Sequence, residues 1–432
     1  MNISTKLLKA AAGQAVGAGL DIDEVFSTFL YDGTGSAQTI TNNIDLSSEG
    51  GLTWFKNRGS AQEHVLFSSA TAGVLSSDST AAIHSASLQP TFNSNGFTLP
   101  NTNWGALNQT SETYVSWTFR KAPKFFDIVT YSGNGSNRTI AHSLGSDVGM
   151  LIVKRVDSSG HWAVFHRQFN GGSSPANYWD QLNNAQAIQS NSTIWNNTAP
   201  TSSVFSVGTA NAVNQSGGTY VAYLFAHNDG DGEFGPDSDQ DVIKCGSYTG
   251  NYTAFKDIDL GFEPQWVLIK NVSTNSRDWM LFDNMRGAVT GGNDAYLTAN
   301  SSSQEYSNEY IQFYANGFSV ANDTHVNQSG NTHIYMAIRR GPLAAPEDAT
   351  KVFAIDGNTS RSNPPTSGFA TDMIISKTTS TTSNWDIGAR LTGKYYQRGN
   401  KTDAQADTST LVWDSMTSVY DVNRTDYQAW MW

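Results

Sequence analysis

Several kinds of residue are scarce in this chain, and each scarcity excludes a class of protein. The 432 residues include one cysteine, Cys245, so an intramolecular disulfide framework is excluded. Charged residues make up 15%, against roughly 25% in ordinary globular proteins. The net charge is -12, and the basic residues are scattered, which disfavours nucleic acid or an anionic membrane as a partner. No apolar run reaches the roughly 18 residues of a membrane span, so we predict none.

The most informative feature that the chain does have is an internal repeat of four copies. Each copy opens with Tyr-x-Gly or its remnant, continues into an apolar segment that ends in lysine, and closes with an aromatic strand. The openings lie roughly 100 to 120 residues apart, a period that predicts tandem domains with separate cores rather than a solenoid or propeller. The openings are Tyr31-Asp-Gly33, Tyr131-Ser-Gly133, Tyr248-Thr-Gly250 and Ile355-Asp-Gly357; the lysines are Lys56, Lys154, Lys270 and Lys377; His64, Trp162, Trp279 and Trp385 follow the lysines.

Each copy has the pattern of an all-β domain. Apolar runs of four to seven residues rich in Val, Ile, Tyr, Trp and Phe alternate with clusters of Gly, Asn, Ser and Thr. We predict four tandem β-sandwich (jelly-roll-like) repeat domains, six to nine strands in each. The repeated aromatic residues are expected to fill the cores, and stacking of some of them on carbohydrate is the alternative. Cys245 lies in a strand-like segment after Ile243 and is expected to be buried rather than reactive.

The predicted domain organisation follows the repeat. Residues 3–12 are expected to form a short helix, with Asn2 or Ser4 as its cap, that is ordered mainly by docking onto another surface. A signal peptide is the weaker alternative, because Lys9 and glycines interrupt its apolar stretch. The predicted units are an N-terminal anchor peptide or helix (1–24), repeat 1 (25–123), repeat 2 (124–229), an acidic linker with repeat 3 (230–342) and a divergent repeat 4 (350–432).

The third copy carries a resemblance to a known family. Its segments Glu263-Pro-Gln-Trp-Val-Leu-Ile-Lys270, Asp278-Trp-Met-Leu-Phe-Asp283 and Asn316-Gly-Phe318 resemble an uncharacterised repeat domain of marine tailed bacteriophages, cyanophages in particular. That domain occurs in tail-fibre-like and other virion structural proteins. The similarity extends over nearly the whole chain after residue 24, although the fourth copy has lost its opening Tyr and its closing Asn-Gln-Ser loop. The resemblance implies a structural or adhesive part of a phage particle and supplies no catalytic residues.

Carboxylate pairs are the candidates for a catalytic site. A glycan depolymerase would need two carboxylates across a cleft, and the candidates are Asp278 with Asp283 and Glu305 with Glu309. Asp278 and Asp283 flank one short strand at an odd offset, so they should point to opposite faces as solvated strand ends. The histidines have no Ser or Cys partner motif. We therefore predict that the chain is not an enzyme, with no catalytic, cofactor-binding or metal-binding residues and no cofactor.

Two further motifs have a structural interpretation. Asp229, Asp231 and Glu233 stand at the 1, 3 and 5 positions of a calcium loop, but the pattern then fails at Phe234 and Gln240. A solvated acidic linker explains the segment more simply, and calcium binding at residues 229–241 stays open. Three asparagines that recur before the last strand of a copy are expected to fix a hairpin turn. They are Asn108, Asn214 and Asn327.

The sequence therefore predicts a non-enzymatic bacteriophage virion structural protein, located on the tail, neck or capsid surface. A tail or neck fibre subunit fits best, anchored to other virion proteins by its N-terminal segment. A host surface glycan is a further candidate partner. A carbohydrate-binding adhesin or a capsid decoration protein is the alternative. We expect a homo-oligomer, a trimer by analogy with other slender fibres, with subunit contacts at exposed aromatic strands near Trp104 and Trp413.

Overall fold

The computed structural model describes residues 19–343, 346, 348–359, 364–407, 411–421 and 426–432, which form an all-β protein. Strands account for 41% and helices for 7% of the chain, so the prediction of an all-β protein is confirmed. Among the described helices, none is long and apolar enough to cross a membrane. The helix expected at residues 3–12 lies outside the described residues.

The strands form four consecutive groups, which we call copies 1 to 4 because they coincide with the sequence repeats. Copy 1 has β1 (Phe26–Asp32), β2 (Gln38–Thr41), β3 (Gly51–Asn57), β4 (Val65–Ser68), β5 (Thr71–Leu75), β6 (Thr91–Asn93), β7 (Gly96–Leu99) and β8 (Thr113–Arg120). Copy 2 has β9 (Phe126–Ser132), β10 (Arg138–Ala141), β11 (Val148–Arg155), β12 (Ala163–His166), β13 (Tyr178–Gln181), β14 (Gln189–Ser190), β15 (Val204–Val207) and β16 (Thr219–Ala226).

Copies 3 and 4 follow in the same way. Copy 3 has β17 (Ile243–Thr249), β18 (Lys256–Asp259), β19 (Pro264–Asn271), β20 (Trp279–Asp283), β21 (Asp294–Thr298), β22 (Tyr306–Asn308), β23 (Ile311–Tyr314), β24 (Gly317–Val320) and β25 (Thr332–Arg339). Copy 4 has β26 (Ala354–Thr359), β27 (Met373–Thr378), β28 (Asp386–Ala389), β29 (Tyr395–Arg398), β30 (Ala406–Asp407), β31 (Leu411–Val412), β32 (Tyr420–Asp421) and β33 (Tyr427–Met431). Helical turns are η1 (Ile22–Glu24), η2 (Ala86–Leu88), η3 (Phe169–Gly172), η4 (Pro175–Asn177), α2 (Ser192–Trp195), α3 (Asn211–Asn214), η5 (Ala349–Lys351) and η6 (Arg390–Thr392).

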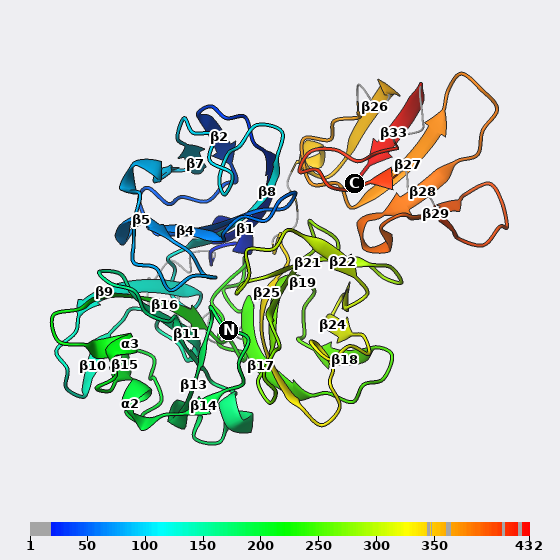
Figure 1. The fold of residues 1–432 in the computed structure, drawn as a ribbon. Coiled ribbons are helices and arrows are strands. Elements are labelled where there is room, and N and C mark those ends of the chain that lie inside the picture. The colour runs from blue at the N-terminus through cyan, green and yellow to red at the C-terminus, as the bar shows by residue number, and fades with distance from the viewer. Residues whose placement is uncertain (1–18, 344–345, 347, 360–363, 408–410, 422–425) are drawn as a thin grey trace, which may run out of the picture.

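One strand order recurs in the four large antiparallel sheets (Figure 1). In each, the first strand of the copy pairs with its last strand, and the last strand pairs with the strand that ends in lysine. The orders are β1-β8-β3-β4-β5, β14-β13-β12-β11-β16-β9, β17-β25-β19-β20-β21-β22 and β26-β33-β27-β28-β29-β30. A smaller sheet covers one face of the large sheet. In copy 1, Ile40 of β2 and Phe97 of β7 pack with Phe55 of β3.

The opposite faces of the first three large sheets share one hydrophobic core. Trp54 of β3, Ile152 of β11 and Leu268 of β19 each stand two residues before the repeated lysine, and all three belong to the same buried cluster. Because both faces of these sheets are covered, nearly every residue of the three strands is buried. Copies 1 to 3 therefore do not have the fully separate cores that the repeat period suggested, although the predicted domain boundaries stay predictions.

A closed series of hydrogen bonds joins copies 1, 2 and 3 into what we call the ring. The amide N of Ile83 in copy 1 donates to Val156 O in copy 2 over 2.9 Å, and Ile188 N in copy 2 donates to Val272 O in copy 3 over 3.1 Å. Glu305 N in copy 3 donates to Arg58 O in copy 1 over 3.0 Å, which closes the series. Each acceptor lies two residues after the repeated lysine, so the three joints are equivalent.

The aromatic residue that follows each lysine reinforces the same joints. Trp162 Nε1 in copy 2 donates to Ser76 O in copy 1 over 3.0 Å, and Trp279 Nε1 in copy 3 donates to Gln181 O in copy 2 over 3.1 Å. His64 in copy 1 interacts with the backbone of Thr298 in copy 3. The prediction that these aromatic side chains fill the core is confirmed for copies 1 to 3, where all three are buried.

The repeated asparagines bind the opening turn of their own copy. Asn108 Oδ1 accepts from Thr34 N over 3.0 Å, and its Nδ2 donates to Ser36 O over 2.7 Å. Asn214 and Asn327 make the equivalent contacts to residues 134–136 and 251–253. They therefore hold the Tyr-x-Gly turn against the closing turn, a longer-range role than the local hairpin turn that we predicted.

Copy 4 departs from the ring in register and in burial. Thr359 pairs with Tyr427 as Tyr31 pairs with Tyr114, so Ile355 is not the counterpart of Tyr31 that the sequence pattern indicated. Ile374, Trp413, Val419, Tyr427, Ala429 and Met431 form its separate core. Figure 1 shows the large sheet of copy 4 set to one side of the other three.

Candidate functional site

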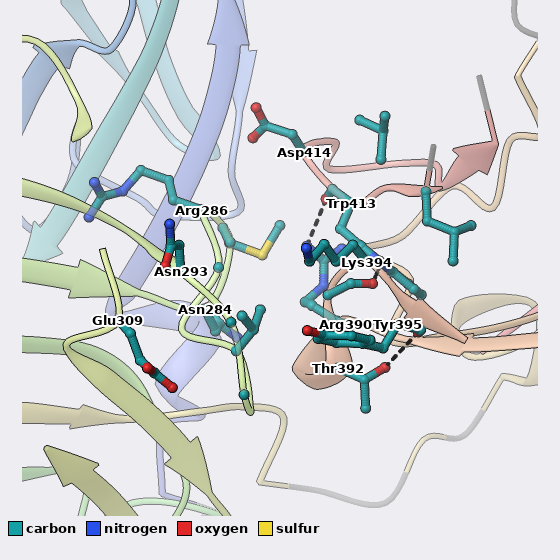
Figure 2. A pocket seen from close by; sticks show the side chains of 18 of the residues that line it. Asn284, Arg286, Asn293, Glu309, Arg390, Thr392, Lys394, Tyr395, Trp413 and Asp414 are labelled. Atoms are coloured by element: carbon teal, nitrogen blue, oxygen red, sulfur yellow. Dashed lines mark hydrogen bonds between the residues drawn. The ribbon is translucent and has the colours of Figure 1, made fainter. Parts of the chain in front are cut away.

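A cleft of about 630 Å³ lies between copy 3 and copy 4. Figure 2 shows Asn284, Arg286, Asn293 and Glu309 on one side of the cleft. The other side holds Arg390, Thr392, Lys394, Tyr395, Trp413 and Asp414. Its walls join across the interface, because Thr290 N donates to Leu391 O over 2.7 Å. The cleft is therefore a feature of the junction between the ring and copy 4.

Arg58 of copy 1 connects three copies beside the cleft. Its Nε and Nη2 donate to the two carboxylate oxygens of Glu305 in copy 3 over 3.0 and 2.8 Å, and its Nη1 binds Asp414 of copy 4 over 2.7 Å. Desolvation alone would raise the pKa of Glu305, but hydrogen bonds and charge interactions with Arg58 and Arg286 lower that pKa below its ordinary value. Glu305 is thus a charged acceptor that is unsuited to donate a proton near neutral pH.

Asp283 belongs to a buried cluster rather than to a catalytic pair. It accepts from Arg286 Nε over 2.7 Å, from Arg286 N over 2.8 Å and from Trp117 Nε1 of copy 1 over 3.0 Å. The guanidinium of Arg286 lies 5.3 Å from the centre of the Trp117 ring. Our interpretation of Asp283 as a solvated strand end is wrong, because Arg286 and Trp117 compensate its burial. Asp278 remains partly exposed and accepts from Asn300 Nδ2.

Arg390 is the most buried cation on the copy 4 side of the cleft. Its Nη1 donates to Trp413 O over 2.9 Å, its Nε donates to Thr371 O over 3.1 Å, and it lies against the Trp413 ring. Burial lowers the pKa of Arg390 to about 10. These contacts and the ion pair with Asp372 all lie within copy 4, so the main effect of Arg390 is to order the wall of the cleft. Trp413 itself is buried and donates from Nε1 to Gly393 O.

These partners determine what the cleft can do chemically. Glu309 is exposed on its rim, whereas Glu305 and Asp414 are held in ion pairs with Arg58. Lys394 is paired with Asp407 over 2.7 Å. The arrangement fits a polar interface that fixes copy 4 against the ring better than an acid and base pair facing a substrate.

The acidic segment 229–241 is stabilised by its own hydrogen bonds. The Asp241 carboxylate accepts from Gly230 N over 2.8 Å and from Gly232 N over 3.0 Å. Glu233 is 3.2 Å from the ammonium of Lys124, and Asp231 Oδ1 accepts from Asp229 N. In the described ranges no group of three or more His, Cys, Asp or Glu side chains is placed to hold a metal ion.

Cys245 and the histidines have structural surroundings. Cys245 is buried as predicted, and burial raises the pKa of its thiol well above the ordinary range. His166 is buried and its Nε2 lies 3.1 Å from Tyr335 O in copy 3. Burial lowers the pKa of His166 to about 3, so the side chain stays neutral. His161 is exposed and contacts Asn183.

The exposed aromatic residues lie elsewhere than we predicted. Trp104 is half-buried in a loop, and Trp413 is buried, so the expected exposed strands near them are not found. Trp385 and Trp432 of copy 4 are 39% and 40% exposed instead.

The fold defines the class of the protein. It is an all-β protein in which three equivalent sheets surround a common core and a fourth sheet is attached at the side. Residues 21–342 match DUF7483, a domain of unknown function, and the chain belongs to that family. The matched segment contains copies 1 to 3, and copy 4 lies beyond it. No curated protein and no solved structure shows significant similarity to the chain.

Proposed function

We propose that this chain is a non-enzymatic structural protein of a bacteriophage particle, a tail or neck fibre subunit. Four tandem β-sandwich repeats form its body, the N-terminal segment attaches it to other virion proteins, and the subunits form a homo-oligomer. The ring carries the proposal, because its three joints use backbone groups and buried aromatic side chains. Such a body is rigid, as a structural component requires. The assignment to phage rests on the motif resemblance of the third copy.

The ionisable residues support a structural function. Asp283, Glu305, Arg58 and Arg286 form a network that joins copies 1 and 3, and breaking such buried pairs destabilises a fold. Their hydrogen-bonding groups are directed at one another rather than at an open site. This arrangement uses charge to hold sheets together.

A carbohydrate-binding adhesin is the second candidate, and a specific observation favours it. Trp385 and Trp432 of copy 4 expose part of their rings to solvent. Aromatic faces of this kind stack on sugars. A glycan array with the purified chain tests the idea: binding that is lost in Trp385→Ala and kept in Tyr252→Ala supports it. A capsid decoration protein is distinguished by its copy number alone.

The first test is quantitative mass spectrometry of purified virus particles, with the major capsid protein as the internal standard. A few to a few tens of copies per particle support a tail or neck fibre. Hundreds indicate a capsid decoration, and absence from particles overturns the virion assignment.

The anchor is tested by deleting residues 1–20. Loss of the chain from particles, with an unchanged circular dichroism spectrum, supports N-terminal attachment. Retention at wild-type copy number contradicts it. If the deletion variant is lost from particles but still binds glycan, the result supports the adhesin as an additional function.

A further inference from the structure

Copy 4 exposes the sheet face that copies 1 to 3 bury in their common core. We call this surface the open face; it consists of Ile355, Met373, Ile375, Trp385, Trp430 and Trp432. Ile375 and Trp430 pair across β27 and β33 as Trp54 and Trp117 pair across β3 and β8. Alternate residues of β27 are buried and accessible, whereas β19 is buried throughout. The open face is thus an apolar sheet surface. It occupies the same position in its sheet as the buried faces of the ring, but no other sheet of the described residues covers it.

The acceptor half of a ring joint is present in copy 4. Lys377 occupies the position of Lys270, and Thr379 stands two residues later, like Val272. Thr379 N donates to Asp426 O over 2.8 Å, as Val272 N donates to Thr332 O. Trp385 also has the local hydrogen bond of its counterpart in the ring, from its backbone N to Asn400 Oδ1 over 3.0 Å.

The donor half is present as well, at the far edge of the same sheet. In the ring, the carbonyl that receives the aromatic side chain ends β13 and β21 and directly follows β5, and the donating amide lies seven residues later. These pairs are Ser76 with Ile83, Gln181 with Ile188 and Thr298 with Glu305. Arg398 ends β29 in copy 4, and Gln405 lies at the same offset. Thr379 and Gln405 are both exposed.

We infer that copy 4 binds copies 4 of two other chains, through the joint that closes the ring within one chain. Gln405 N of each chain donates to Thr379 O of the next, Trp385 is covered by the residue 398–405 segment of its neighbour, and the three open faces form a common core. A contact whose two halves differ produces either a closed ring or an open filament. The joints of copies 1 to 3 close after three steps, which predicts a trimer.

A second copy is the occupant that the structure favours, because the same sheet binds its own relatives three times elsewhere in the chain. The inference deepens the proposed homo-oligomeric fibre and rests on that proposal for its biological setting. Its test uses purified full-length protein, so the interface can fail while the virion assignment stands. Conversely, a trimer in solution says nothing about copy number on a particle.

The decisive experiment is site-directed cross-linking between chains. Thr379→Cys and Gln405→Cys place thiols on opposite sides of the joint, at the short backbone separation that a hydrogen bond imposes. Cys245 is buried and adds little background. Mixing the two single variants under mild oxidation should give a cross-linked pair, whereas either variant alone should not. The double variant should give a ladder that stops at three chains.

Each other result of the cross-linking experiment counts against the inference. A ladder beyond three chains means an open filament, and no cross-link between the single variants means that the joint is absent. The matched control Ser173→Cys with Thr379→Cys should stay uncross-linked, because residue 173 lies in copy 2 away from the open face.

The assembly mass gives an independent test. Light scattering on the full chain should give three times its 46.8 kDa, and Ile355→Lys should give the monomer. Ile355 is 56% exposed, so this change does not disturb a core. Tyr252→Lys, at a residue 49% exposed in copy 3, is the control and should stay trimeric.

The remaining outcomes overturn the inference in distinguishable ways. A wild-type monomer or dimer contradicts the three-fold closure. A wild-type monomer that becomes trimeric when residues 1–18 are deleted shows that the chain's own N-terminus covers the open face. A monomer that binds a glycan through Trp385 assigns the open face to carbohydrate.

Discussion

The strand that ends in lysine occurs four times, and its surroundings differ between the ring and copy 4. Lys154 and Lys270 in the ring donate to a backbone carbonyl of the neighbouring copy, over 3.3 and 2.7 Å. Lys377 in copy 4 donates to Ser383 O, six residues away in the same copy. The same strand pattern therefore forms part of a joint between copies in one place and only a local contact in the other. A repeated sequence specifies a sheet; its neighbours determine how many faces are buried.

The largest expected difference is between the two equivalent tryptophans. Trp279→Ala removes a buried side chain and its bond to Gln181 O, so it should cost about 3–5 kcal/mol of unfolding free energy. Trp385→Ala, on the open face, should cost less than about 1 kcal/mol when measured on the monomer. Urea unfolding followed by tryptophan fluorescence checks both values. Equal losses would show that the two faces are equally covered.

A buried carboxylate in the ring gives the next largest effect. Asp283→Ala leaves Arg286 and Trp117 Nε1 without their acceptor and should cost about 3 kcal/mol. Copy 4 has Ala389 at the equivalent position, so it has no such network to lose. Asp278→Ala is the control and should change stability by less than about 0.5 kcal/mol. Thermal unfolding measures Tm for both variants. A similar decrease in Tm for Asp283→Ala and Asp278→Ala would contradict the buried network.

The joint between copies 2 and 3 should make stability depend on pH. Burial raises the pKa of Asp180 to about 7, against the attraction of Lys270 at 3.8 Å. The folded state therefore holds a proton that the unfolded state releases between about pH 4 and pH 7. This contribution is complete below pH 4 and is lost as the pH rises through 7, by roughly 1–3 kcal/mol.

Asp180→Asn is the matched variant for this pH effect. It should flatten the pH dependence of the unfolding free energy over the same range. Copy 4 already has an uncharged residue, Gln397, at the equivalent position. Urea midpoints at intervals from pH 4 to 8 measure the slope. An unchanged slope in Asp180→Asn would assign the dependence to another group.

The smallest expected effect concerns the attachment of copy 4 to the ring. Asp414 is 41% exposed and pairs with Arg58, so Asp414→Asn should weaken the attachment by less than about 1 kcal/mol. Limited proteolysis that separates copy 4 from the ring should become faster, and added salt should reduce the difference between variant and wild type. Asp407→Asn breaks an ion pair within copy 4 and should leave the cleavage rate unchanged.

The sequence predicted the all-β class and the repeated elements because both depend on local patterns. The lysines, the aromatic residues after them and the Tyr-x-Gly turns all occupy equivalent places in copies 1 to 3. The run Met150-Leu-Ile-Val-Lys154 also contained a signal for the ring, since a continuous apolar strand is typical of a sheet that is buried on both faces. The pattern in copy 4 changes to alternation at β33, where Gln428 lies between buried neighbours.

The joints and the cleft could not be predicted in the same way. The joints use backbone N–H and C=O groups of Ile83, Ile188 and Glu305, and these groups have no signature in the side-chain sequence. Asp283 was misinterpreted because its compensating partners include Trp117, which is distant in sequence. Trp413 was expected at the surface because nothing local indicated that Gly393 O would accept its Nε1–H.

A threefold arrangement can be formed by three copies within one chain, as in the ring, or by three identical chains. Three copies within one polypeptide assemble at an effective concentration fixed by their linkers, so the ring does not dissociate on dilution. Each joint can also change by itself, and copy 1 accordingly carries His64 where copies 2 and 3 carry tryptophan. Identical chains lack that freedom, because one substitution is repeated at every joint. A threefold body encoded in one chain can therefore present three different surfaces.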